Sequence, residues 1–338
     1  MIIHLVQIAD SSSRRVALVE EPYLRCLTGI SSVYELAQEC LRASRSIAED
    51  AVSRATGETL LYDDVYNGKS SWRLLAPIDV PGIPSRLLVA GTGLTHLGSA
   101  QQRQAMHLAD QPKREEILTD SMRMFQWGVD AGRPPENQIG IAPEWFFKGD
   151  GSVVRAHLEP LEIPECAEDG GEEAEIAGIY IVAEDGTPYR IGMANGNEFS
   201  DHKFEKRNYL NLAGSKLRTC SLGPELVVGA EFGDIRGRVK IQRSGESLWQ
   251  KSISTGEKNM CHSLANLEHH HFKFAGHRQP GSVHVHFFGA DALSFADDIV
   301  LREGDITEVS FEGYGRPLRN SITEEVKSTH PVRVRSLA

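Results

Sequence analysis

From about Ile139 onward, short apolar segments alternate with Gly, Pro and Asp, a pattern typical of strands joined by turns. The clearest of these segments are 176–182, 189–194, 225–228, 238–243, 282–288 and 308–311. The turn sequence Glu-Asp-Gly-Thr-Pro at 184–188 predicts a hairpin between the first two segments. The second half of the chain is therefore expected to be rich in strands, with helices added.

The start of the chain is patterned differently and predicts a separate, smaller lobe. Its expected elements are strands at 1–8, 14–21 and 86–90 and a helix at 31–54. Beyond the lobe, a second helix is expected at about 113–131. The second helix is expected to stop at Gly132, because Arg133-Pro134-Pro135 follows it. We expect a lobe over residues 1–100 and a larger domain over residues 101–338.

Composition and charge exclude several classes of function. The formal net charge of −11 disfavours binding to a phosphate backbone, so no nucleic-acid partner is expected. The five cysteines are dispersed and form no C-x-x-C pair, which indicates a reducing compartment. No basic segment precedes the first apolar run, and no apolar stretch approaches the roughly 20 residues that span a bilayer. We expect a cytoplasmic protein with no membrane partner.

Paired carboxylates at the start of the segment 176–182 carry the clearest chemistry. Glu173 and Glu175 lie two apart, so in an extended chain both face the same side. Adjacent carboxylates repel each other unless a proton or a cation intervenes, and a hard divalent ion prefers oxygen ligands. The predicted hairpin brings either Glu198 or Asp201 close enough to supply a third carboxylate.

Seven segments between about residues 143 and 320 resemble motifs of the fumarylacetoacetate hydrolase-like superfamily, and they occur in the same order along the chain. They are Pro143–Gly149 (P-x-x-F-x-K-G), Glu173–Ile176 (E-x-E-L), Gly192–Ser200 (G-x-x-x-x-N-D-x-S), Lys216 with Gly223-Pro224, Ser254–Gly256 (S-T-G), Pro280–Val283 (P-G-D-V), and Gly304-Asp305 with Gly313–Gly315. The branch that the chain resembles most is that of the GguC-like proteins of bacterial sugar catabolism. The resemblance implies an α+β fold, with a β-rich roll or barrel-like catalytic core and a smaller N-terminal α/β lobe, and it implies a homodimer.

The resemblance also implies roles for individual residues. The metal ligands would be Glu173, Glu175 and Glu198, holding Mg²⁺ or alternatively Mn²⁺ or Ca²⁺. Lys216 would be the active-site lysine, and the residues beside the substrate would be Lys148, Gly149, Ser152 and Thr219. The superfamily usually carries Asp where this chain has Glu198, so Asp201 stays an alternative third ligand.

Histidines supply two more candidates. The segment Gly91–His96 falls where hydrolases of this superfamily carry N-Y-x-x-H, so His96 is a candidate catalytic residue. A threonine-containing loop of the superfamily is replaced here by His286 and two phenylalanines, which makes His286 a candidate substrate contact. The run 269–271 and the pair of His284 and His286 also suggest zinc, but three adjacent histidines do not converge easily on one ion.

The resemblance implies a small 2-oxo acid as the substrate, and the carboxylate and keto oxygens of such an acid can both bind the metal. A cation there withdraws electrons from C2 and makes a C3 proton acidic, and Lys216 helps to stabilise the enolate. The first hypothesis is a lyase that dehydrates a 2-keto-3-deoxy sugar acid, a pentonate, in sugar catabolism. The alternatives are a hydrolase that splits the C–C bond of a 2,4-dioxo acid, and a non-catalytic protein that binds a metal or a sugar acid.

Overall fold

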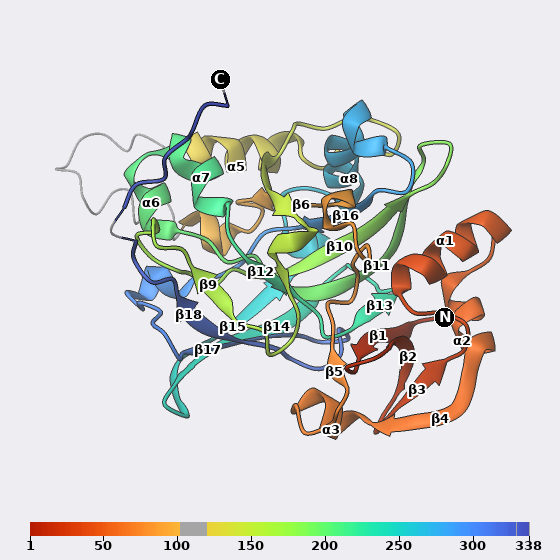
Figure 1. Ribbon diagram of the computed structural model, residues 1–338. Coiled ribbons are helices and arrows are strands. Elements are labelled where there is room, and N and C mark those ends of the chain that lie inside the picture. The colour runs from red at the N-terminus through yellow and green to blue at the C-terminus, as the bar shows by residue number, and fades with distance from the viewer. Residues whose placement is uncertain (102–119, 329, 338) are drawn as a thin grey trace.

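Two β-sheets dominate the computed structural model, which describes residues 1–101, 120–328 and 330–337. Within these residues the larger sheet has 13 strands and the smaller has five. Figure 1 shows the N-terminal strands at one side of the molecule and the two sheets of the core beside them. No helix of the described part is long and apolar enough to cross a membrane.

The N-terminal lobe is an antiparallel meander with helices on it. Its strands are β1 (Ile3–Ala9), β2 (Arg14–Glu20), β3 (Tyr23–Leu27) and β4 (Ala55–Leu61). The single helix predicted over 31–54 is two helices, α1 (Val33–Ala43) and α2 (Ile47–Arg54). The chain turns between them because Ser44 adopts a left-handed conformation with φ 51°, and Ser46 then caps α2.

The large sheet continues from this lobe into the core without a break. Beyond β1 its order is β13 (Leu226–Val228), β11 (Pro188–Asn197), β10 (Ala174–Val182), β16 (Val283–Phe287), β6 (Leu87–Gly93) and β7 (Glu144–Asp150). The predicted hairpin is confirmed as the antiparallel pair β10–β11. Strand β6 precedes the predicted boundary at residue 100, yet it belongs to the core sheet, where it lies between β16, to which it is parallel, and the edge strand β7.

The small sheet covers one face of the β10–β11 hairpin. Its order is β15 (Glu246–Thr255), β14 (Ile235–Arg243), β17 (Ile306–Phe311), β18 (Leu318–Glu324) and β9 (Leu161–Ile163). Buried side chains from both sheets form one cluster, in which Ile176 and Met193 pack with Val239 and Val309. Residues on the other face of β10 and β16, among them Ile179 and Val285, pack in the main core with α1.

Shorter elements complete the fold around the sheets. They are α3 (Tyr62–Tyr66), β5 (Arg73–Leu74), α5 (Asp120–Ala131), β8 (Val154–Arg155), α6 (His202–Arg207), α7 (Leu212–Lys216), β12 (Cys220–Leu222) and α8 (Leu264–Phe272). There are also 3₁₀ turns at Pro84–Arg86, Gly151–Val153, Tyr209–Asn211, Glu257–Asn259, Ala275–Arg278 and Ser294–Asp297. The helix predicted over about 113–131 is confirmed from Asp120 onward, and its first residues lie outside the described ones.

A buried carboxylate, Glu225, joins the N-terminal lobe to the core. Its oxygens accept hydrogen bonds from the Tyr62 hydroxyl (2.8 Å) and from the backbone N–H of Arg316 (2.9 Å), and the Nδ1 of His4 lies at 2.7 Å. Gly315 packs directly on this carboxylate, because a Cβ there would lie 2.1 Å from an oxygen. The Arg316 guanidinium covers the Tyr62 ring, 3.9 Å from its centre.

Replacing Glu225 by Ala should therefore lower the free energy of unfolding by about 3 kcal/mol, because buried donors lose their acceptor. Urea unfolding measures the change. The control is Glu21→Ala, which removes a half-exposed partner of Arg316 and should cost no more than about 1 kcal/mol. Equal losses in the two variants would contradict a special role for the buried carboxylate.

Candidate active site and metal centre

Three carboxylates meet at one end of the β10–β11 hairpin. Glu173 and Glu175 lie at the start of β10, and Glu198 follows the last residue of β11. The pairing of Ala174 with Asn197 places them side by side, and the N–H of Glu198 donates to the carbonyl of Glu173 (2.9 Å). One oxygen of each carboxylate lies within 4.8 Å of the others, and all three side chains are buried. The geometry expected of the three predicted ligands is present.

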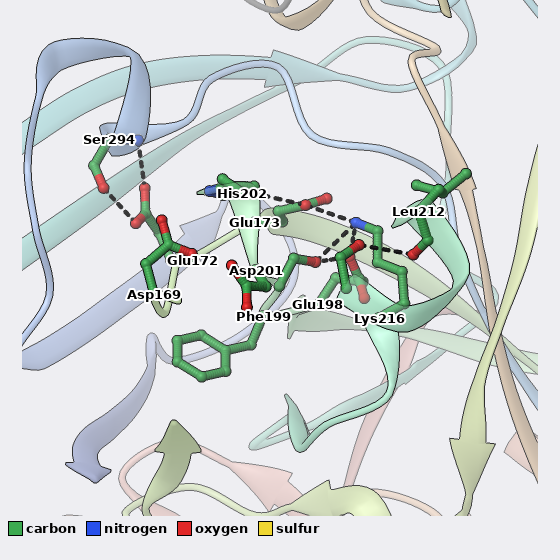
Figure 2. A network of polar contacts seen from close by, with 12 residues as sticks. Asp169, Glu172, Glu173, Glu198, Phe199, Asp201, His202, Leu212, Lys216 and Ser294 are labelled. Atoms are coloured by element: carbon green, nitrogen blue, oxygen red, sulfur yellow. Dashed lines mark hydrogen bonds and ion pairs between the residues drawn. The ribbon is translucent and has the colours of Figure 1, made fainter. Parts of the chain in front are cut away.

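The alternative ligand, Asp201, serves a different purpose. One of its oxygens accepts from the N–H of Phe204 (2.9 Å) and so caps α6, and the other pairs with the Arg218 guanidinium at 3.0 Å. Figure 2 shows Asp201 beside the cluster, while the carboxylates of Glu173 and Glu198 are both joined to Lys216. Of the two candidates for the third carboxylate, Glu198 is therefore the one that the fold brings to the group.

Two buried lysines stand among the carboxylates. The Nζ of Lys216 lies 2.7 Å from Glu173, 2.5 Å from Glu198 and 2.8 Å from the Ser200 hydroxyl. The Nζ of Lys148 lies 2.7 Å from the other oxygen of Glu198 and donates to the carbonyl of Phe199, also at 2.7 Å. Burial lowers the pKa of Lys148, although the charge of Glu198 opposes this shift. Each ammonium is thus held by hydrogen bonds and not by charge alone.

The remaining carboxylate, Glu175, indicates where a cation fits. Burial raises its pKa well above the usual range, and the charges of Glu173 and Glu198 raise it further. Its Oε2 accepts from the N–H of Gly289 (2.6 Å), whereas its Oε1 is buried with no hydrogen-bond partner among the described residues. An oxygen of this kind beside two other carboxylates is the donor set that Mg²⁺ prefers, so these residues fit a divalent ion.

A histidine that the sequence analysis did not single out holds Glu173 in place. The Nε2 of His202 lies 3.0 Å from the Oε1 of Glu173 (Figure 2). Burial by itself would lower the pKa of His202. The hydrogen bond to Glu173 and the charge of Glu173 outweigh burial, so the pKa of His202 is raised. Gly171 makes room for the ring, since a Cβ there would lie 2.2 Å from its Nδ1. The position of His202, four residues after Glu198, is the signal in the sequence that could have pointed to it.

Strand β7 adds a fourth carboxylate on the same side of the sheet. Its alternate residues Glu144, Phe146 and Lys148 face inward, and the Phe146 ring lies 4.5 Å below the Nζ of Lys216. Two glycines of β6 leave the space, because a Cβ on Gly91 would meet the Phe146 ring at 2.4 Å and one on Gly93 would meet Glu144 at 2.2 Å. Glu144 lies inside the resembling segment Pro143–Gly149, but no role followed from the sequence.

The structure places His96 in a closed hydrogen-bonded group. Its Nδ1 lies 2.8 Å from the Thr95 hydroxyl, which itself donates to the carbonyl of Phe288, and its Nε2 lies 3.1 Å from the Thr255 hydroxyl. Because the Thr95 hydroxyl already donates its hydrogen, the Nδ1–H of His96 donates to Thr95. Complete burial lowers the pKa of His96 to about 3. Near neutral pH its Nε2 therefore carries no hydrogen and accepts from the Thr255 hydroxyl. Both ring nitrogens are thus occupied by threonines, and the proposed catalytic role stays a prediction.

His286 points away from the carboxylates. In β16, Phe287 pairs with Ala177 of β10 and shares a face with Glu175, so the neighbouring His286 faces the other side of the sheet. There its Nε2 lies 2.7 Å from the Thr92 hydroxyl and its ring stacks on His271 at 4.6 Å. The structure does not bring this predicted substrate contact to the carboxylate cluster.

The other predicted substrate contacts surround a surface hollow of about 510 Å³, whose lining includes Lys148, Gly149, Ser152 and Thr219. The Ser152 hydroxyl donates to Asp150 (2.5 Å), and the Thr219 hydroxyl accepts from the N–H of Glu162 (3.0 Å). Lys148 borders this hollow while its ammonium reaches Glu198, so it is the member of the group that also touches the cluster.

Solved structures of enzymes share this architecture along nearly the whole chain. A 2-keto-3-deoxy-D-arabinonate dehydratase complexed with magnesium and 2,5-dioxopentanoate matches with a TM-score of 0.67 at 16% identity, over 96% of this chain and 100% of that one. A fumarylacetoacetate hydrolase from psychrophilic Exiguobacterium antarcticum matches with a TM-score of 0.59 at 16% identity, with the same coverage of 96% and 100%. This chain has the fumarylacetoacetate hydrolase-like fold.

A 2-hydroxyhepta-2,4-diene-1,7-dioate isomerase from Mycobacterium marinum has the fumarylacetoacetate hydrolase-like fold as well. It matches with a TM-score of 0.58 at 17% identity, over 96% of this chain and 100% of that one. No protein-family model and no curated protein sequence matches this chain. The predicted fold class, α+β with a β-rich core, is confirmed, and the resemblance read from the motifs is confirmed at the level of the fold.

Mg²⁺ should stabilise the wild-type protein but not Glu175→Gln, which lacks one carboxylate and keeps the side-chain shape. At an ion concentration of about 100 times the dissociation constant, the free energy of unfolding should rise by about 2.7 kcal/mol. Urea unfolding with and without Mg²⁺ measures the effect. Glu165→Gln, at an exposed carboxylate, is the control and should respond as the wild type does. If Mg²⁺ stabilised Glu175→Gln as much as the wild type, Glu175 would not be a metal ligand.

Lowering the pH should destabilise the protein through His96. A histidine in the unfolded chain titrates near its usual pKa of about 6.5, whereas His96 in the folded state titrates at about 3. Between these values the unfolded state binds an extra proton, so stability falls as the pH falls, by up to about 1.4 kcal/mol per pH unit. Urea unfolding between about pH 6 and about pH 4 should show a shallower pH dependence in His96→Gln.

His269→Gln is the matched control for this pH dependence, because the His269 side chain is exposed. Its unfolding should keep the slope of the wild type. A slope that His96→Gln leaves unchanged would mean that the buried ring is protonated in the folded protein, which would revive a role for His96 in proton transfer.

Proposed function

We propose that this chain is a Mg²⁺-dependent dehydratase of a 2-keto-3-deoxy sugar acid, a pentonate, and a member of the fumarylacetoacetate hydrolase-like superfamily in its GguC-like branch. The observation that carries the proposal is the buried group of Glu173, Glu175 and Glu198 with Lys216 beside it. A structure with the same fold contains magnesium and 2,5-dioxopentanoate, a 2-oxo acid, which supports a ligand of this class.

A divalent cation bound by the three carboxylates would act as a Lewis acid toward the carboxylate and keto oxygens of a 2-oxo acid. The residues of the chain supply the rest. Lys216 stands between two of the carboxylates, where its positive charge stabilises the negative charge that develops on the substrate oxygen. The Phe146 ring lies against its ammonium, with the ring centre 4.5 Å from the Nζ, and presents an apolar face there.

We assign the removal of the C3 proton to Glu144, which shares the inner face of β7 with Phe146 and Lys148. The electron pair of the C3–H bond forms the C3–C4 double bond as the C4–O bond breaks. The leaving hydroxyl takes the proton from Glu144 and departs as water, so the carboxylate is regenerated. The Glu144 side chain is buried, so bulk water is kept away from the proton that it transfers.

Hydrolysis of a 2,4-dioxo acid requires instead a base that activates water. His96, the candidate for that role, has both ring nitrogens in contact with threonine hydroxyls and none with a carboxylate in the described hydrogen bonds. A histidine that activates water is commonly oriented by a carboxylate, so a His–Glu pair here would favour a hydrolase. The hydrogen bonds of His96 therefore support dehydration over hydrolysis.

The test is product analysis by mass spectrometry on a 2-keto-3-deoxypentonate and its 4-oxo counterpart, each with Mg²⁺ and with a chelator. Loss of one water from the first substrate, only with Mg²⁺, is the expected result. Glu144→Gln should slow this reaction by at least about 100-fold while Mg²⁺ still stabilises the protein against urea. Glu136→Gln, at an exposed carboxylate, is the control and should keep the wild-type rate.

Other outcomes separate the alternatives. Cleavage of the 4-oxo acid would identify a hydrolase and return attention to His96. Tight binding of either acid without turnover would identify a non-catalytic binding protein. Full activity of Glu144→Gln would leave the dehydratase in place and remove Glu144 as the C3 base.

A further inference from the structure

Three imidazoles meet on the face of the sheet that lies opposite the carboxylate cluster. They belong to His271 near the end of α8, His277 in the 3₁₀ turn Ala275–Arg278, and His284 in β16. One ring nitrogen of each lies within 4.8 Å of the other two. The rings of His271 and His284 are buried and that of His277 is half-buried, so the group is closed on one side and reachable from solvent on the other.

Hydrogen bonds determine which nitrogen carries the hydrogen in two of these rings, those of His277 and His284. The Nδ1 of His277 lies 2.6 Å from the carbonyl oxygen of His271, so Nδ1 carries the hydrogen and Nε2 carries the lone pair. The Ser282 hydroxyl donates to the carbonyl of Gln279 (2.7 Å), so it accepts from the Nε2 of His284 at 3.2 Å. The Nδ1 of His284 therefore has its lone pair facing the Nε2 of His271, 3.0 Å away. Metal-binding histidines are oriented by outer partners of this kind.

The hydrogen of the His271 ring lies on a different nitrogen in the metal-free protein than it would in a metal-bound one. The Trp145 indole N–H donates to its Nδ1 at 3.2 Å, so the hydrogen of the ring lies on Nε2 and points to His284. When a cation takes the place of that hydrogen, the proton moves to Nδ1 of the same ring. The indole N–H of Trp145 must then turn away, since two donors cannot face each other.

We infer that His271, His277 and His284 form a second metal site, for one divalent transition metal of the zinc class. Neutral imidazoles bind Zn²⁺, Co²⁺ and Ni²⁺, whereas Mg²⁺ prefers the oxygen ligands of the carboxylate cluster. With Zn–N bonds of about 2.0–2.1 Å, neighbouring nitrogens of a tetrahedral site lie about 3.3 Å apart. The 3.0 Å between His271 and His284 is close to this value. Three protein ligands leave the fourth position to water.

This site differs from the one that a run of histidines suggests. Of the run 269–271 only His271 takes part, because neighbouring residues of a helix point in different directions and His269 is exposed. The other two ligands come from the turn after α8 and from β16. A metal ion would thus tie α8 and the following turn to the strand that ends just before Gly289, the residue whose N–H holds Glu175.

Zinc uptake in the presence of saturating Mg²⁺ tests the inference, because Mg²⁺ occupies the carboxylate cluster. Isothermal titration with ZnCl₂, followed by metal analysis after desalting, should give one Zn²⁺ per chain for the wild type and for Glu175→Gln. His277→Ala, at the half-buried ligand, should retain none. His269→Ala is the matched control from the same stretch of sequence, and it should retain one ion as the wild type does.

Two spectroscopic measurements test the ligands independently of the amount of zinc retained. Co²⁺ in place of Zn²⁺ should give the visible absorption of a four-coordinate ion in the wild type and not in His277→Ala. Zinc should also change the indole emission of the wild type and leave that of Trp145→Phe unchanged. Wild-type protein that takes up no Zn²⁺ in Mg²⁺, or a His277→Ala variant that retains as much as the wild type, would overturn the second site.

Discussion

The burial of three carboxylates at the end of one hairpin is the constraint on which the rest of this structure depends. An isolated carboxylate in a protein interior is strongly unfavourable unless opposite charges and hydrogen bonds surround it. Lys148 and Lys216 meet that demand with contacts of 2.5 to 2.7 Å to the carboxylates of Glu173 and Glu198. The lysines come from β7 and from α7, so these elements must converge on the hairpin for the charges to be tolerated. Glu175 keeps one oxygen without a hydrogen-bond partner among the described residues, and a divalent cation would supply that partner.

Strand alternation separates two kinds of chemistry on one sheet. In β16, Phe287 faces the carboxylates, whereas His284 and His286 face α8 and the turn that follows it. Carboxylate oxygens thus collect on one side of the sheet and imidazole nitrogens on the other. If both proposed sites bind metals, their ligand types would favour a hard ion at the first and a softer ion at the second.

Three enzymes named for different reactions, a dehydratase, an isomerase and a hydrolase, share the fold of this chain. The fold alone therefore does not decide the reaction, and the groups beside the carboxylates must do so. The groups proposed for this role are Lys216, which contacts two of the carboxylates, and Glu144, for which Gly93 leaves space on the same side of the sheet. His96 lies close in sequence to Gly93 but is closed off by Thr95 and Thr255. This contrast underlies the proposed dehydration.

The sequence by itself determined what depends on neighbours in the chain. Glu173 and Glu175 share a side because they lie two apart in a strand, and the turn at 184–188 returns the chain so that Glu198 joins them. Only the tertiary structure decided which face of each strand meets which partner. It turned His286 away from the cluster, brought His202 into contact with Glu173, placed Glu144 opposite Gly93, and gathered His277 with His284. These outcomes depend on strand order and on the packing of distant elements, and a shift of one residue in register reverses a side chain's face. A single sequence carries no direct record of such long-range contacts.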